Sequence, residues 1–250
     1  MMNLFDLTGK KALVTGGGRG IGLALAKGLH EAGVRVAILD VAENVQDVAA
    51  AELGPDGVGV RVDLMDRDAS RLAFQEVVDR LGGLDILINN AGMQFKHDFL
   101  DYPLERWDRI LELNLSCAFR FMQLAGQYMQ AHGGGRIINV ASMNAFLGGT
   151  QCPAYAATKA GIVALTKSGT NELSRFGINV NAIAPGFILT ELTQHIVNDP
   201  VAYEAKTVRI PKGRWGQVEE LVGTVLFLCA PASEYVCGAV IPIDGGYLCK

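Results

Sequence analysis

The chain has 250 residues, a formal net charge of −4 at pH 7, and half of its residues are hydrophobic. This composition suits one α/β domain with a buried core, and the absence of a basic block argues against a nucleic-acid-binding protein. The five widely spaced cysteines form no CxxC pair, the N-terminus lacks a signal-peptide pattern, and no apolar run is long enough for a membrane span. We therefore expect a soluble cytoplasmic protein with reduced thiols and no metal ion.

Short β-branched runs alternate with longer helical patterns along the whole chain. Strands are predicted near residues 11–15, 34–39, 58–62, 84–88, 136–141, 178–184 and 239–243. Helices are predicted near 20–32, 43–53, 67–81, 103–131, 152–176 and 217–229. Nearly unbroken apolar runs such as VRVAIL are typical of strands covered on both faces, and repeated β-α-β order predicts a parallel sheet. No linker or repeat divides the chain, so we predict a single domain over residues 1–250.

The segment 187–215 interrupts this alternation between the sixth and seventh strands. Such an insertion is either a surface excursion or a lid over a site. We favour a substrate lid.

A glycine-rich turn, TGGGRGIG, stands between the first strand and the first helix. Glycines there let backbone N–H groups approach a dinucleotide's pyrophosphate, and the helix N-terminus adds partial positive charge. By itself this is also the pattern of an ordinary strand–helix turn. Asp40 favours the nucleotide site, because it ends the second strand, where an acid can hydrogen-bond the adenosine ribose.

The same aspartate bears on the choice of cofactor. A carboxylate at Asp40 repels the 2′-phosphate of NADP, so we predict NAD. Arg19 is the opposing signal, because a guanidinium in this turn can pair with that phosphate. We weight Asp40 above Arg19, since no basic residue follows it in VAEN.

Three further polar pieces follow strands, at the edge where open α/β sheets bind ligands. They are NNAG after the fourth strand, Ser142 after the fifth, and the pair Tyr155 and Lys159 on the next helix. A tyrosine and a lysine four residues apart share one helix face, although such a pair alone also arises by chance.

These motifs, in this order, resemble the short-chain dehydrogenase/reductase family over essentially the whole chain. The resemblance is carried by TGGGRGIG, Asp40, Asp63, NNAG, Asn114 in LELNLS, Ser142, YAATK, NAIAPGFILT and IPIDGG. It implies a Rossmann-type, doubly wound sheet of seven parallel strands in the order 3-2-1-4-5-6-7, with helices on both faces. It also implies a nicotinamide dinucleotide and a homotetramer.

The resemblance assigns catalytic roles to four residues. Tyr155 would be the acid/base, Lys159 would lower its pKa and hold the ribose, Ser142 would orient the substrate oxygen, and Asn114 would hold a relay water. A tyrosine's pKa of ~10 makes it a poor base at neutral pH, so a nearby ammonium and the positive nicotinamide are needed. The implied cofactor contacts are Gly16, Gly18, Arg19, Gly20, Ile21, Gly22, Asp40, Asp63, Leu64, Asn90, Ala91, Gly92, Tyr155, Lys159, Pro185, Gly186, Ile188 and Thr190.

Within the family, the chain is most similar to sugar-acid enzymes such as 2-deoxygluconate 3-dehydrogenase and gluconate 5-dehydrogenase. NLFDLTGK, ASMNAFLGG, INVNAIAPG and RIPKGRWG carry this likeness. A sugar acid needs a cation for its carboxylate and polar groups for its hydroxyls, and the candidates are Lys96, His97, Asn144, Thr150, Gln151, Arg209 and Trp215. Gln151 departs from relatives with a basic residue there, so we favour Lys96 or Arg209 as the cation, and Trp215 could close over the carbon skeleton of the substrate. The alternatives are solvated surface charges for Lys96 and Arg209 and packing within the lid for Trp215.

Two alternatives remain open. One is a ketone reductase of another substrate class, acting on an acyl carrier, a steroid or a polyol. The other is a dinucleotide-sensing protein without catalysis.

The predicted tetramer would use the long helices near 103–131 and 152–176 and the C-terminal strand region. Outward apolar residues on them, Ala118, Phe121, Met122 and Ala164, would be buried between subunits. The alternative for each is packing on its own sheet.

Overall fold

The computed structural model describes residues 4–250, except for the side chains of Leu192 and His195. Within this range the chain forms one sheet of seven strands in the order β3-β2-β1-β4-β5-β6-β7. Every neighbouring pair is parallel. The strands are β1 Lys11–Thr15, β2 Arg35–Asp40, β3 Val58–Arg61, β4 Ile86–Asn89, β5 Gly135–Val140, β6 Ile178–Pro185 and β7 Val240–Ile243. The predicted fold is therefore confirmed.

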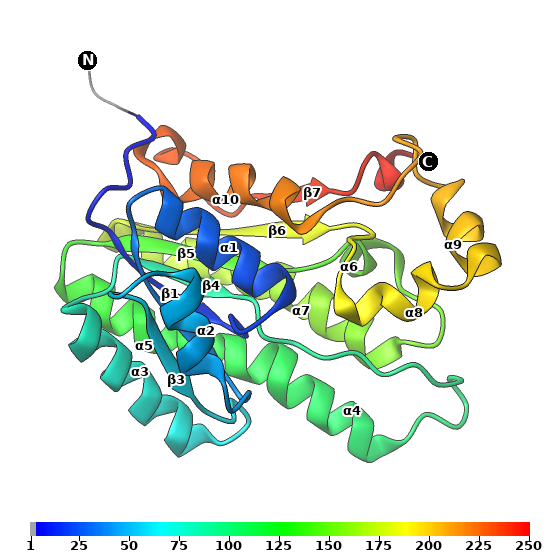
Figure 1. Ribbon diagram of the computed structural model, residues 1–250, viewed down its shortest axis with the longest axis horizontal. Coiled ribbons are helices and arrows are strands. Elements are labelled where there is room, and N and C mark those ends of the chain that lie inside the picture. The colour runs from blue at the N-terminus through cyan, green and yellow to red at the C-terminus, as the bar shows by residue number, and fades with distance from the viewer. Residues whose placement is uncertain (1–3) are drawn as a thin grey trace.

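Helices cover both faces of the sheet (Figure 1). One layer contains α1 (Gly20–Glu31), α2 (Val45–Glu52) and α10 (Val222–Cys229), and the other contains α3 (Arg67–Leu81), α5 (Cys117–Ala131) and α7 (Pro153–Leu173). A separate apolar cluster fills the space under each layer. The central strands are buried along nearly their whole length, which explains their unbroken apolar sequences.

The predicted lid is a set of short helices beyond the carboxyl ends of the strands (Figure 1). It contains a 3₁₀ turn at Glu191–Thr193, α8 (Gln194–Val197) and α9 (Pro200–Thr207), and it lies near α6 (Asn144–Leu147). Its apolar side chains, including Trp215 and Ile210, pack in one cluster with Met143 after β5 and Tyr247 near the C-terminus. This segment is thus anchored to the sheet end by a cluster distinct from the two under the helix layers.

The helix predicted over 103–131 is interrupted by a wider turn. α4 (Leu104–Leu111) runs into a π-helical turn at Glu112–Ser116, and α5 follows at once. π-turns occur mostly as single turns within α-helices, often at functional sites. Here the turn contains Asn114, one of the predicted catalytic residues.

The predicted outward positions on this helix are wrong for three residues. Ala118, Phe121 and Met122 are 7%, 0% and 5% exposed and pack within their own chain. Ala164 on α7 does face outward.

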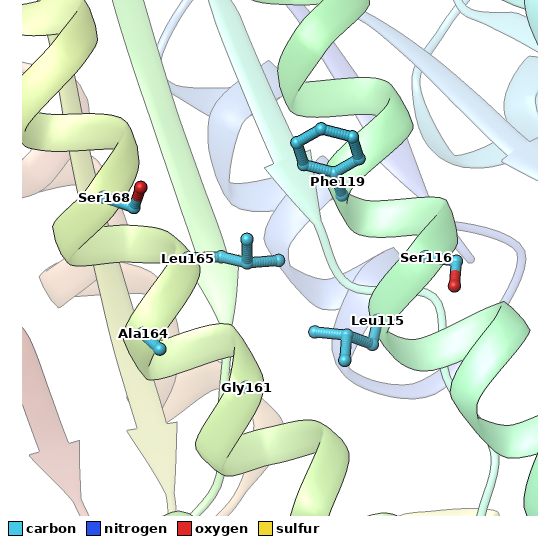
Figure 2. Close-up of a pocket in the computed structure, with 7 residues that line it drawn as sticks. All are labelled: Leu115, Ser116, Phe119, Gly161, Ala164, Leu165 and Ser168. Carbon is cyan, nitrogen blue, oxygen red and sulfur yellow. The ribbon is translucent and has the colours of Figure 1, made fainter.

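Ala164 lines an apolar groove between the π-turn, α5 and α7, with a volume of about 460 Å³ (Figure 2). The other lining residues are Leu115, Ser116, Phe119, Gly161, Leu165 and Ser168. Leu115 and Leu165 extend into this groove from opposite helices.

No helix in the described part of the chain is long and apolar enough to cross a membrane. All five cysteines are free thiols.

Candidate nucleotide and catalytic site

The glycine turn after β1 is packed against the segment after β4. Gly16 has φ +62°, and a Cβ there would lie 2.9 Å from the Cα of Ala91. A Cβ on Gly22 would lie 2.1 Å from the carbonyl oxygen of Gly16, which no backbone shift of ordinary size could relieve. These two glycines are required by close approach of the backbone to itself.

Gly20 is required for a different reason. Its φ is +55°, but a Cβ there would meet no atom within 4 Å, so the space above the first turn of α1 is open. The preceding residue, Arg19, provides no side-chain cap to this helix. The turn therefore presents open backbone donors at a helix N-terminus, which fits the phosphates of a dinucleotide.

Asp40 ends β2 beside this turn. Its carboxylate accepts hydrogen bonds from the backbone N–H groups of Gly18 (2.9 Å) and Ala42 (3.1 Å). A Cβ on Gly18 would come within 2.9 Å of that carboxylate. Asp40 is thus held at the strand end, at the position predicted for a ribose contact.

The charges around Asp40 include pairs that the sequence patterns did not reveal. Arg19 pairs with Glu191 of the lid at 3.3 Å, and Arg61 at the end of β3 pairs with Glu43 at 3.1 Å. Both guanidinium groups near the predicted ribose site therefore have carboxylate partners. The register of β2 and β3 places Arg61 next to Asp40, and the sequence alone does not give this register.

The predicted adenine side is built from the turn after β3. Asp63 is exposed, and its carboxylate accepts a hydrogen bond from the N–H of Met65 (2.9 Å). Leu64 is buried, and its carbonyl accepts hydrogen bonds from Ser70 Oγ (3.1 Å) and Arg120 Nη2 (2.7 Å). These bonds fix the turn that would contact the adenine.

The NNAG segment supports the glycine turn directly. Asn90 Nδ2 donates to the carbonyls of Thr15 (3.0 Å) and Gly16 (2.9 Å). The N–H groups of Asn90 and Ala91 both donate to Thr15 Oγ1. The side chain of Asn90 therefore holds the phosphate-binding turn in place, and Gly92 faces Asn114, whose Oδ1 a Cβ would approach to 3.3 Å.

The predicted nicotinamide side follows β6. Gly186 donates its N–H to Ile243 at 3.0 Å, and a Cβ on it would lie 2.7 Å from the backbone of Asp244. Pro185 pairs with Ile243 in the sheet, while Ile188 is buried and forms an isolated bridge with Gly216. Thr190 begins the lid with a capping box, in which its N–H donates to Thr193 Oγ1 at 3.0 Å.

Ser142, Tyr155 and Lys159 come together where β5 meets α7. A hydrogen bond with Ser142 opposes the effect of burial on the phenol, but burial is the larger effect and raises the pKa of Tyr155. Lys159 Nζ lies 5.6 Å from the centroid of the Tyr155 ring and donates to the carbonyl of Val140 at 2.6 Å. Burial lowers the pKa of Lys159 to about 8.

Asn114 is 1% exposed within the π-turn. Its Oδ1 accepts from the N–H of Met93 (2.8 Å), and its Nδ2 donates to the carbonyl of Met93 (2.9 Å). Nδ2 also lies 3.4 Å from Thr158 Oγ1 on α7. The side chain thereby joins the segment after β4 to the helix of Tyr155 and Lys159.

The comparisons with known proteins agree with this geometry. A family model described as enoyl-(acyl carrier protein) reductase matches residues 16–248. A short-chain type dehydrogenase/reductase from Mycobacterium marinum is 38% identical, with a TM-score of 0.92 over 100% of this chain and 99% of that one. The chain belongs to the short-chain dehydrogenase/reductase family. As a member of this family it is an oxidoreductase.

Two similar members of the family have names that specify a substrate. One is 2-dehydro-3-deoxy-D-gluconate 5-dehydrogenase from Escherichia coli K12, 39% identical over 100% of both chains. The other is a gluconate 5-dehydrogenase from Burkholderia cenocepacia, whose crystal structure contains NADP and tartrate. It is 37% identical, with a TM-score of 0.94 over 99% of this chain and 98% of that one.

In the present chain, two residues near the catalytic group, Cys152 and Gln94, were not predicted as site residues. Cys152 is buried at the N-cap of α7, three residues before Tyr155, and the side chain of Gln94 acts on its thiol. Burial raises the pKa of this thiol, and Gln94 and the nearby Lys96 ammonium partly oppose the rise. The spacing of Cys152 and Tyr155, three residues apart on one helix face, was the available signal for Cys152.

Of the predicted substrate residues, Lys96 and Asn144 lie near this cluster. Asn144 Nδ2 is 4.0 Å from Cys152 Sγ, and its backbone N–H donates to Ser142 Oγ at 3.2 Å. Gln151, exposed at the start of α7, donates from Nε2 to Asp98 at 2.6 Å.

The two predicted lid residues are placed differently. Trp215 is 1% exposed and stacks on Phe187 with ring centroids 4.8 Å apart, so it packs inside the lid and offers no surface to a substrate. Arg209 is exposed and lies over the ring of Tyr247 at 4.7 Å.

Proposed function

We propose that this protein is an NAD-dependent dehydrogenase that interconverts a secondary alcohol and a ketone on a sugar acid, such as a gluconate or deoxygluconate. The observation that carries the proposal is the Ser142, Tyr155 and Lys159 group, together with the exposed Lys96 on the loop after β4, whose charge acts on the Cys152 thiol. A cation on this loop gives an anionic polyol a second point of attachment. The names of the sugar-acid relatives support the same assignment.

Each residue of the site has its own role in the proposed reaction. When bound, a nicotinamide dinucleotide supplies the hydride acceptor. Tyr155 Oη takes the proton of the substrate hydroxyl, and Ser142 Oγ orients that hydroxyl. Because burial raises the pKa of Tyr155 in the chain alone, positive charge from Lys159 and the oxidised cofactor is needed to form the phenolate. Asn114 fixes the floor of the site through Met93.

The preference for NAD rests on the charges around Asp40. Three carboxylates, Asp40, Glu43 and Glu191, face two guanidinium groups, Arg19 and Arg61, and both guanidinium groups are paired. These five groups carry a net charge of −1, and a 2′-phosphate would have to approach the Asp40 carboxylate, which repels it. The Burkholderia relative was crystallised with NADP, so the cofactor preference of the present protein is tested by experiment.

One experiment tests both the sugar-acid substrate and the preference for NAD. Oxidation of gluconate, 2-deoxygluconate, related aldonates, uncharged polyols and hydrophobic secondary alcohols is followed with NAD and with NADP. We expect the largest kcat/KM with an aldonate and NAD. Asp40→Ser should reduce the ratio of kcat/KM with NAD to kcat/KM with NADP. Activity on polyols or hydrophobic alcohols without activity on any aldonate would reject the sugar-acid assignment, and equal kcat/KM for the two cofactors would reject NAD preference.

The alternatives have specific weaknesses. A steroid reductase has no evident use for the exposed Lys96 on the loop after β4. The matching family model is described as an enoyl-(acyl carrier protein) reductase, but the similar proteins with a substrate in their names are sugar-acid enzymes. A dinucleotide-sensing protein would not need Ser142, Tyr155 and Lys159 together.

We also propose that the working form is a homotetramer. The apolar groove between α5 and α7 offers Phe119, which is 49% exposed, and Ala164 to a second copy (Figure 2). An apolar face of this kind on the outer side of two long helices suits a symmetric interface.

A further inference from the structure

Gln151 has an unusual backbone conformation. Apart from glycines, it is the single residue with a positive φ, +61°, in the part of the chain that the structure describes. A side chain with a Cβ is strained in this region, and such strain persists only where surrounding contacts enforce it. The contacts that enforce it here all lead to the loop after β4.

Two hydrogen bonds connect Gln151 to that loop. Its Nε2 donates to Asp98 Oδ1 at 2.6 Å, and its carbonyl accepts from the N–H of His97 at 2.9 Å. The side chain of Gln94, on the other side of Lys96, also acts on the thiol of the next residue, Cys152. The loop is therefore attached to Gln151 directly after Lys96, through His97 and Asp98.

We propose that Gln151 is a positioning residue, which holds the Lys96 loop against the catalytic turn through Asp98 and His97 and does not itself bind the substrate. This inference rests on the proposed sugar-acid function, in which Lys96 attracts the substrate carboxylate. The donor group of Gln151 is already engaged, because Nε2 points at a carboxylate in a charge-assisted hydrogen bond. The same bond gives the Asp98 carboxylate a partner, in a loop where Lys96 must attract an anion.

The decisive variant is Gln151→Glu, which places a second carboxylate opposite Asp98. We expect KM for the aldonate to rise about 10-fold, with kcat and KM for NAD changed less than about 3-fold, since a misplaced cation weakens only binding of the charged substrate. KM for an uncharged polyol should not change. In a Lys96→Ala background the same substitution should have no further effect on KM for the aldonate.

A charge-conserving rescue separates the hydrogen bond from charge. Gln151→Glu combined with Asp98→Asn has the native charge and restores the bond in the opposite direction, so KM should return to within about 3-fold of the original. Gln151→Gly relieves the backbone strain and keeps the bond from His97, but loses the bond to Asp98. It should therefore raise KM for the aldonate without lowering Tm.

A second readout does not depend on the substrate. Cys152 is 2% exposed beneath the attached loop, so Gln151→Glu should speed its labelling by a maleimide at least about 5-fold, measured on the peptide by mass spectrometry. If no aldonate is oxidised, the proposed function fails, and labelling alone decides whether Gln151 positions the loop. Unchanged KM for the aldonate together with unchanged labelling of Cys152 would overturn the inference.

Discussion

Lys159 is a buried ammonium, and replacing it should change how stability depends on pH. It is 4% exposed, and burial lowers its pKa from 10.5 to about 8. Between these two values the unfolded chain keeps the proton that the folded chain has released, so the stability of the native enzyme rises with pH in that window. At about 1.4 kcal/mol for each unit of pKa, the native enzyme should gain about 2–3 kcal/mol between pH 7 and pH 10 relative to Lys159→Met.

The difference between the two proteins at one pH is less informative. Lys159→Met removes the buried charge, but it also removes the donor to the carbonyl of Val140, which costs about 1–3 kcal/mol if that oxygen finds no other partner. At pH 7 the removal of the buried charge stabilises the protein and the loss of the hydrogen bond destabilises it, so the two effects oppose each other. Only the contribution of the Lys159 charge varies with pH, so the slope of the stability difference against pH measures that contribution.

The assay is urea unfolding of the nucleotide-free enzyme at several values of pH from 7 to 10, at one fixed protein concentration. Tyr155 lies beside Lys159, so it is replaced by Phe in both proteins, and the remaining titrating groups contribute equally and cancel in the difference. Lys167→Met, at an exposed position of α7, is the matched control. Its free energy of unfolding should vary with pH in parallel with that of the native enzyme. Parallel stability profiles for the native enzyme and Lys159→Met would show that the Lys159 pKa is not depressed and would refute the reasoning.

The other predictions concern turnover, the glycine turn and assembly. Tyr155→Phe should lower kcat at least about 100-fold while NADH fluorescence still reports binding, and a loss below about 10-fold would exclude Tyr155 as the acid/base. Gly20→Ala should abolish NADH binding and cost only about 1–2 kcal/mol of stability, because open space surrounds its Cβ but φ is +55°. Gly22→Ala should instead prevent stable folding, since its Cβ would lie 2.1 Å from the oxygen of Gly16; similar melting temperatures for the two variants would contradict this distinction. Ala164→Arg should reduce the mass measured by light scattering at micromolar concentration without loss of secondary structure, and a native enzyme that is already monomeric would reject the tetramer.

The parts of the fold that follow from local chemistry could be predicted from the sequence. Apolar strands and the glycine turn depend on backbone geometry and burial, which short motifs encode. The ends of α3 coincide with the prediction because Asp66 caps its N-terminus and Gly82, in the left-handed conformation, ends it.

The parts that depend on tertiary contacts could not be predicted. The π-turn has no distinct pattern in LELNLS, because it is stabilised by the bonds from Asn114 to Met93, which is distant in sequence. The extra residue in that turn also changes which face of α5 meets the sheet, so Phe121 was predicted outward and lies in the core. The partners of Arg19 and Gln151 are likewise far along the chain, and only the folded structure pairs them.

The π-turn also makes the protein sensitive to the deletion of a single residue at this point of the chain. Deleting one residue between Glu112 and Ser116 would restore an unbroken α-helix and rotate α4 by about 100° relative to α5. Asn114 would leave Met93, and Ile110, the buried residue of α4, would turn away from its packing. Deleting one residue from the π-turn should abolish enzymatic activity. Deleting one residue from the exposed turn after α5 should leave activity and folding largely intact.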